Sequence, residues 1–143
     1  MRLPWARHDV MTRSIAHGDS FLDDLLDTED TRLLTEIGFI ALSAGLDGPA
    51  ERIFGGIEAA RPGQEAGPIG RALVQMARDE LDAAITILRA LPPSDAALSY
   101  LGLALARRGD GVEAKAILQR VARTASDAAF IELATAALEG LPG

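Results

Sequence analysis

The stretch LGLALARRGDGVEAKAILQRV (residues 101–121) decides the fold of this chain. An apolar run rich in leucine and alanine stops at Arg-Arg-Gly-Asp-Gly (107–111), and the same helical spacing of apolar residues then resumes. Gly109 and Gly111 flank Asp110, a composition typical of the turn that follows a helix. The pattern therefore predicts two helices folded against each other.

This unit recurs, because a glycine in an apolar context appears every 32 residues, at Gly38, Gly70 and Gly102. A polar break and a second helical segment follow each glycine. One helix hairpin cannot bury both its apolar faces, so neighbouring hairpins must stack. DAAFIELATAAL (127–138) resembles DAALSYLGLALA (95–106) at the same offset and predicts a closing helix. The fold class is therefore all-α, with three hairpins and a C-terminal helix.

Small residues are expected where the helices of a hairpin cross. A bulky side chain at such a position would cost about 1–3 kcal/mol. Ala83 is one position out of step with its counterparts, which indicates one additional residue in the middle turn. The expected crossing residues are Gly38, Gly70, Gly102 and Ala134 on the first helices and Ala50, Ala83 and Ala114 on the second helices.

The N-terminal part divides into an irregular segment (1–19) and a short helix predicted over SFLDDLLDTED (20–30), which begins a single domain over 20–143. Ser20 is the expected N-cap. The helix has two interpretations: it packs on the first hairpin, or it fills the groove described below. One of its faces is apolar and carries Phe21, Leu22, Leu25 and Leu26.

The bulk composition limits the classes of partner. The chain is 48% hydrophobic but 4% aromatic, a mixture that suits close helix packing, and its net charge of −7 argues against nucleic acid and anionic lipid. Apolar stretches of about ten residues are too short to span a bilayer. There is no cysteine. The N-terminus has no apolar signal region, so we expect a cytoplasmic protein without membrane insertion.

Small and apolar residues recur in a fixed order around the glycines: Leu34, Ile37, Gly38, Ala41, Ala50, Phe54, Ile57 and Pro62 in the first unit, and Leu98, Leu101, Gly102, Leu105, Ala114, Leu118 and Val121 in the third. Through this pattern, residues 31–139 resemble the tetratricopeptide-repeat (TPR) family. The period of 32 differs from the usual 34, and the family's aromatic positions are mostly aliphatic here.

The TPR resemblance implies a curved stack whose first helices line a concave groove. Four other apolar residues of these helices are expected in the core and not in the groove: Ile37, Leu101, Leu105 and Leu133. An apolar groove with a few arginines suits an amphipathic helix or an apolar peptide. Its occupant would be a partner protein, a second copy of the chain or the chain's own N-terminus. The groove residues predicted by counting from each glycine are Arg32, Phe39, Leu42, Arg71, Val74, Leu103, Arg107, Ile131 and Leu138.

Residues typical of catalysis or metal binding are sparse. His8 and His17 are the only histidines, and their spacing does not place them on one helix face. The glycine-containing turns lack the lysine of a phosphate-binding loop. We therefore expect a non-enzyme with no cofactor, metal or catalytic residue.

A narrower resemblance concerns the run EIGFIALSAGLDGPAERIFGGIEAARPGQ (36–64), which is similar to the opening hairpin of Hrp-type accessory proteins of type III secretion. Needle-subunit chaperones of these systems are also small and acidic. The resemblance implies a chaperone or accessory protein that holds an aggregation-prone secretion subunit in its groove. The alternative from another class is a homodimeric helical-repeat scaffold.

Overall fold

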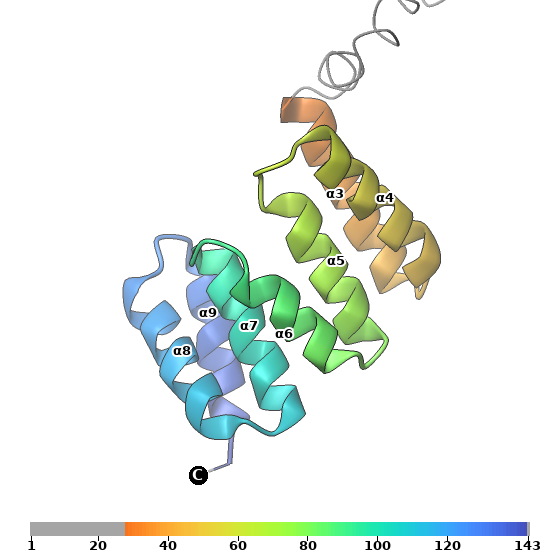
Figure 1. The fold of residues 1–143 in the computed structure, drawn as a ribbon. Helices are drawn as coiled ribbons and strands as arrows, with labels where there is room; N and C mark the ends of the chain where they lie inside the picture. Colours follow the sequence, from red (N-terminus) through yellow and green to blue (C-terminus); the bar gives the residue numbers. More distant parts are fainter. Residues whose placement is uncertain (1–27, 143) are drawn as a thin grey trace, which may run out of the picture.

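The computed structural model describes residues 28–142, and in this range all regular structure is α-helical (Figure 1). Three helix hairpins, α3–α4, α5–α6 and α7–α8, precede a single helix α9, as predicted. Of the helix predicted over 20–30, only residues 28–30 are described, as the first turn of α3. The bounds are α3 Thr28–Ser43, α4 Asp47–Ala60, α5 Ala66–Ala77, α6 Leu81–Arg89, α7 Asp95–Arg108, α8 Gly111–Thr124 and α9 Ala128–Glu139.

The three hairpin turns share one backbone geometry. Each contains a residue in the left-handed region, with φ of 79° at Gly45, 60° at Asp79 and 100° at Gly109. In each turn the next N–H donates to the carbonyl five residues earlier, at 2.8–2.9 Å. This hydrogen bond is the Schellman motif that ends many helices. Equivalent positions of the repeat therefore adopt equivalent conformations.

The repeat glycines make room for large side chains of the second helices. A Cβ added at Gly38 would lie 2.6 Å from Cζ of Phe54, and one added at Gly102 would lie 2.6 Å from Cδ2 of Leu118. Phe54 and Leu118 are fully buried and 64 residues apart. In the first and third hairpins the glycine thus faces its own partner helix, as expected.

The middle hairpin departs from this prediction. A Cβ at Gly70 would collide with Phe54 of the preceding hairpin. Asp79 follows Gly70 by nine residues, whereas the left-handed glycines follow theirs by seven. Two additional helical residues rotate the exit direction by about 200°. Helix α6 consequently packs on a different side of α5 from the one that carries Gly70, and the Gly70 side packs on α4 of the preceding hairpin.

The two additional residues in α5 also shift the position at which α6 crosses α5, so the prediction for that position needs correction. Ala83 is exposed, and Ala84, which is fully buried, takes the place that Ala50 and Ala114 have in the other hairpins. The prediction of Ala83 at the crossing was therefore wrong by one position, because the insertion is two residues long and lies in α5.

The core consists of three neighbouring clusters, and consecutive helices pack throughout the described range. Leu101 and Leu105 are buried, as expected, and Leu133 is partly exposed. Ile37 is 41% exposed, so the prediction that it is a core residue was wrong. It lies on the first described helix, where no further described helix packs beyond it.

Candidate functional site

The first helices of the hairpins lie next to one another. Helix α3 contacts α5, α5 contacts α7, and α7 contacts α9. The predicted groove residues come from these four helices, and the structure separates them into buried, partly exposed and exposed positions.

The apolar candidates do not form one continuous stripe. Val74 has no exposed surface and packs with Ala41, Ala50 and Phe54, so its prediction as a groove residue was wrong. It lies four residues after Gly70, on the side of α5 that packs against the preceding hairpin. Phe39, Leu42, Leu103 and Leu138 are partly exposed, and each packs against one of the three core clusters.

Two aromatic contacts occur near these positions. The ring of Phe39 lies 5.3 Å from that of Phe54 at an interplanar angle of 58°, and Tyr100 of α7 meets Phe130 of α9 edge to face at 6.0 Å. Ile131 is partly exposed and is not among the side chains that pack on the core clusters. Ile131 is therefore the apolar groove candidate that is partly exposed without packing on a core cluster.

Two of the three arginine groove candidates, Arg71 and Arg107, form ion pairs with carboxylates of the chain. Arg71 donates from Nη1 to Oε2 of Glu58 on α4 at 2.7 Å, and Arg107 lies 3.4 Å from a carboxylate oxygen of Asp79. Both pairs are substantially solvent-exposed, so each contributes at most about 1 kcal/mol. Arg32 is exposed. The arginines at 32 and 107 are consequently better placed for an acidic partner group than Arg71.

Counting from the glycines missed the most exposed apolar surface of the first hairpin. Leu33, Ile37 and Ile40 of α3 are 56%, 41% and 67% exposed, and their spacing of four and three residues places them along one side of the helix. We call these three residues the α3 outer stripe. Their apolar character is visible in the sequence, but of the three only Ile37 was assigned a place, and that place was the core.

A chain of ion pairs runs along the turn ends of the hairpins. Arg78 bonds Asp47 at 2.6 Å and also Glu51, and Arg108 bonds Asp82 at 2.8 Å and Asp110 at 2.5 Å. The hydrogen bond that Arg78 donates lowers the pKa of the Asp47 carboxyl below its usual value. In turn, Asp47 and Glu51 raise the pKa of Arg78, and Asp82 and Asp110 raise the pKa of Arg108. These contacts link consecutive hairpins, so they support the register of the stack.

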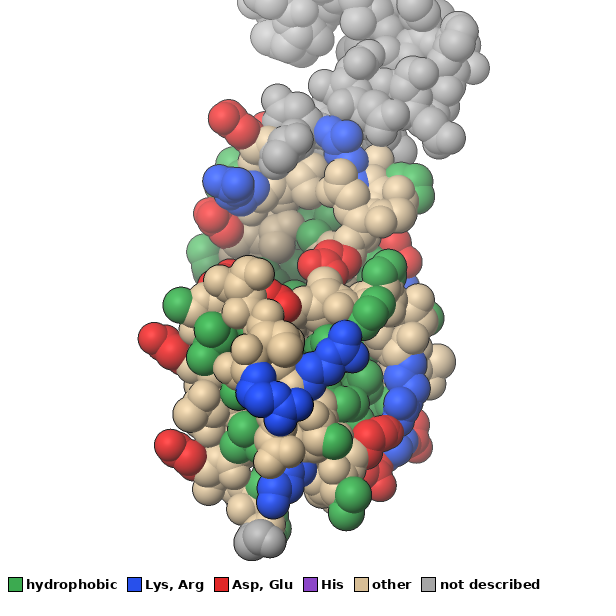
Figure 2. All heavy atoms as spheres, turned by 90° about the vertical axis from the view of Figure 1, so that its left-hand side faces the viewer, with side chains coloured by type: hydrophobic (Ala, Val, Ile, Leu, Met, Phe, Trp, Pro, Cys, Tyr) green, Lys and Arg blue, Asp and Glu red, His purple; other side chains and the backbone are tan. Residues whose placement is uncertain are grey.

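Charge is unevenly distributed over the surface. Basic side chains gather on the lower half of the face shown in Figure 2, which is formed by the C-terminal helices. Lys115, Arg120 and Arg123 are exposed on α8. This face contrasts with the net charge of −7 of the whole chain.

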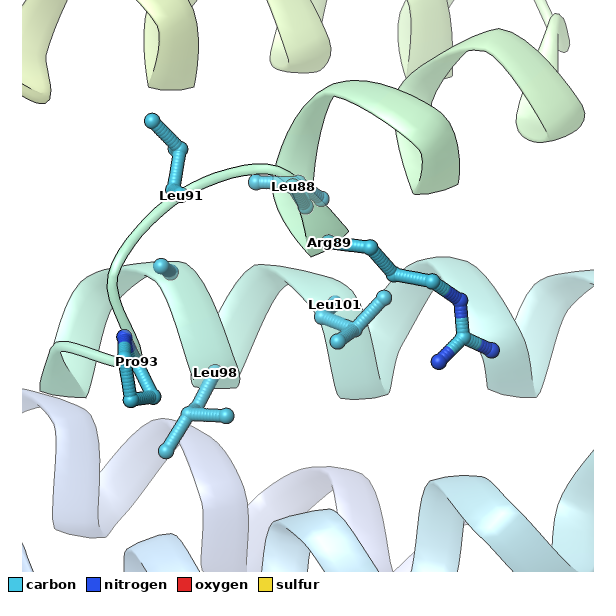
Figure 3. A pocket seen from close by; sticks show the side chains of 7 residues that line it. Leu88, Arg89, Leu91, Pro93, Leu98 and Leu101 are labelled. Carbon is cyan, nitrogen blue, oxygen red and sulfur yellow. The ribbon is translucent and has the colours of Figure 1, made fainter.

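Two hollows lie beside the loops that join the hairpins. The smaller, of about 280 Å³, is bounded by Leu91 and Pro93 of the loop and by Leu98 and Leu101 of α7, with Arg89 at its side (Figure 3). It is predominantly aliphatic. The larger, of about 610 Å³, contains the carboxylates of Glu58 and Glu65, which accept bonds from Arg71 and Ser94. Both carboxylates already serve structural contacts.

Within residues 28–142 there is no group of three or more side chains suited to hold a metal ion, and none of the helices there is long and apolar enough to cross a membrane. His8 and His17 lie outside the described residues. Comparisons with family models, with curated proteins and with solved structures give no match to this chain.

Proposed function

We propose that this chain is a cytoplasmic TPR-like module that binds another protein, with the first helices as the binding side. The observation that carries the proposal is the series of partly exposed apolar side chains on α3, α7 and α9, with exposed arginines beside them. Repeat stacks of this kind generally offer an extended surface rather than a reaction centre. The groove residues retained by the proposal are Arg32, Phe39, Leu42, Leu103, Arg107, Ile131 and Leu138.

The chemistry of these residues selects the partner. A helix with leucine or isoleucine at positions i, i+3, i+4 and i+7 presents an apolar face of matching type. Acidic residues along the border of that face would meet Arg32 or Arg107. The proposed ligand is therefore an amphipathic helix, or an apolar segment, with acidic flanks.

The proposal extends to a type III secretion chaperone or accessory protein. It is supported by the acidic charge, the small size and the resemblance of residues 36–64 to Hrp-type proteins. In this role the chain would hold an aggregation-prone secretion subunit. The test is light scattering of a purified needle-type subunit: added chain should suppress its aggregation, and an unchanged aggregation rate would contradict the secretion role while leaving the binding module to the next test.

The binding side is tested with a fluorescent amphipathic helical peptide and its sequence-scrambled form. Ile131→Glu is expected to weaken binding of the amphipathic peptide about tenfold, or about 1.4 kcal/mol, because it puts a charge into an apolar contact. Val112→Glu is the matched control, since Val112 is 90% exposed on the second helix α8. Equal effects of both variants, or equal binding of the scrambled peptide, would contradict the proposal.

The alternative function is a homodimeric scaffold, and the exposed α3 outer stripe is the observation that favours it. Light scattering of the purified chain across concentration separates the two. A stable dimer that Ile40→Glu dissociates would support the scaffold, whereas a monomer at all concentrations would contradict it.

A further inference from the structure

Exposed large apolar side chains gather on two helices of the described range. The α3 outer stripe holds three of them, Val112 of α8 is a fourth and is 90% exposed, and Leu46 lies in the turn that follows α3. Helix α3 belongs to the first hairpin and α8 to the last, so the two helices lie far apart along the stack (Figure 1). One copy of the chain therefore cannot bring these two surfaces together.

The exposed side of α8 is basic, and Figure 2 shows basic side chains gathered over the C-terminal helices. We call this side the α8 basic face; its exposed residues are Val112, Lys115, Ala116, Arg120 and Arg123. None of its three cationic side chains forms an ion pair with another described residue. The acidic residue of α8, Glu113, is already bonded to Arg89. The face is thus positively charged without an internal counter-charge.

The α3 outer stripe lies among acidic residues. Glu29 and Glu36 are exposed, and neither forms an ion pair within the described range. Counting about 100° per residue places both carboxylates on the same side of α3 as Leu33 and Ile40. Arg32 lies about 60° away around the helix from Glu29, at the border of this side. This side of α3 therefore combines carboxylates with aliphatic side chains and complements the α8 basic face.

The order of these residues along the two helices agrees with antiparallel packing. Glu29 and Ile40 are about 16 Å apart along α3, and Val112 and Arg123 have the same separation along α8. When Glu29 is placed opposite Arg123, Ile40 therefore comes to lie opposite Val112. An ion pair then forms at one end of the contact and an aliphatic pair at the other.

The same register brings a second pair of opposite charges together. Glu36 comes to lie opposite Ala116, and Lys115 is the next residue on the same border of the contact. In the parallel orientation Glu29 would lie against the aliphatic side chain of Val112 instead. Burying a carboxylate there without a partner is costly, so the charges select the antiparallel orientation.

We propose that α3 of one copy of the chain packs antiparallel on the α8 basic face of a second copy. The two faces differ, so the contact is head-to-tail, and association continues beyond a dimer unless the copies close into a ring. The contact extends the scaffold alternative by naming the face that receives α3. It uses none of the proposed groove residues, so self-association and groove binding can fail independently.

The expected association is weak. A contact between single helix faces buries less than the approximately 800 Å² per partner of a typical stable interface. At about 0.15 M salt the repulsion between two chains of net charge −7 is screened beyond about 8 Å, whereas charges in contact still attract. The ion pairs then determine partner and register more than affinity.

The experiment is a charge exchange followed by light scattering at protein concentrations up to about 1 mM, where weak association is detected. Glu29→Lys with Glu36→Lys reverses the α3 side, and Lys115→Glu with Arg123→Glu reverses the α8 basic face. Each double variant alone should stay monomeric at concentrations at which the unmutated chain associates. An equimolar mixture of the two should associate again, because each offers the face that fits the other. The four changes in one chain, which preserve its net charge, should restore self-association.

The matched control is Glu132→Lys with Glu139→Lys, which makes the same change of charge at exposed positions of α9. This variant should associate as the unmutated chain does, and circular dichroism verifies that every variant is folded. An unmutated chain that is monomeric at every concentration would overturn the proposal. Association that survives in either double variant, a mixture that stays monomeric, or an equal loss in the control would overturn it as well.

Discussion

Gly67 is a glycine of α5 at which an added Cβ would meet backbone atoms of the preceding hairpin, and Gly67→Ala tests this close approach. A Cβ added there would lie 2.7 Å from Cα, N and Cβ of Glu58 on α4. An ordinary contact between such atoms is 3.4–4 Å. The atoms it meets include the backbone of α4, which cannot turn aside as a flexible side chain can, so α4 and α5 must separate by about 1 Å.

The cost follows from two opposing effects. Overpacking of this kind costs about 1–3 kcal/mol, and contact with backbone places it in the upper part of that range. Alanine regains up to about 1 kcal/mol over glycine in a helix. We therefore expect Gly67→Ala to lower the free energy of unfolding by about 2 kcal/mol, equivalent to roughly 6–10 °C in Tm for a domain of this size.

The assay is urea unfolding followed by circular dichroism, with two other glycines as references. Gly56 is exposed on α4 with nothing within 4 Å of an added Cβ, so Gly56→Ala should stabilise the chain by about 0.4–1 kcal/mol. Gly102→Ala meets the side chain of Leu118, which can shift, and should fall between the two. A Gly67→Ala variant as stable as Gly56→Ala would refute the close approach of α4 and α5.

Further predictions concern the turns and the titrating groups. Asp79→Gly should raise stability by about 0.5–1 kcal/mol in urea unfolding, because φ of 60° strains an L-residue more than glycine; a loss of stability would contradict this. Arg78→Gln should return the pKa of Asp47 toward about 3.9, measured by NMR titration. Since that pKa is lowered in the folded chain, the ion pair stabilises the unmutated chain above about pH 4, and this contribution disappears as the pH falls through the lowered pKa. Arg78→Gln should therefore be less stable than the unmutated chain above about pH 4 and equally stable at lower pH; a pH-independent loss of stability would exclude the ion pair as its cause. Burial raises the pKa of Tyr100, the single tyrosine, so its phenolate absorbance should appear above the usual pH of about 10 and return to it in urea; a native titration near 10 would show that the ring is solvated.

Much of the fold was accessible from the sequence because the repeat is carried by residues with strong steric requirements. Gly38 and Gly102 face Phe54 and Leu118 closely, and no larger residue fits at those glycines without displacement. Such positions recur at a fixed spacing and identify the hairpins. Ser94 and Asp127 accept hydrogen bonds from the backbone N–H groups of Ala97 and Ala129 at the starts of α7 and α9, the role for which serine and aspartate are preferred at helix N-caps.

The candidate surface was harder to predict from the sequence, because the spacing of residues shows which side of a helix they lie on but not which neighbouring helix packs on that side. Val74 and Leu42 both follow their glycine by four residues, yet Val74 is buried and Leu42 is partly exposed. The difference is the hairpin that precedes α5. Ile37 shows the converse: its counterpart Leu101 is covered by α6, whereas the described helices leave Ile37 open.

The two additional residues in α5 explain why the structural repeat is 64 residues long although the glycines recur every 32. Gly70 packs on Phe54 of α4, as Ala134 packs in the cluster of Leu118 on α8. Helices α3, α4 and α5 therefore correspond to α7, α8 and α9, and α6 is the helix that joins the two groups of three. Its buried residues serve both α5 and α7, because they share a cluster with Ile69 and Leu101. The joining helix therefore covers one side of α7, whereas the described helices leave the corresponding side of α3, with Leu33, Ile37 and Ile40, exposed.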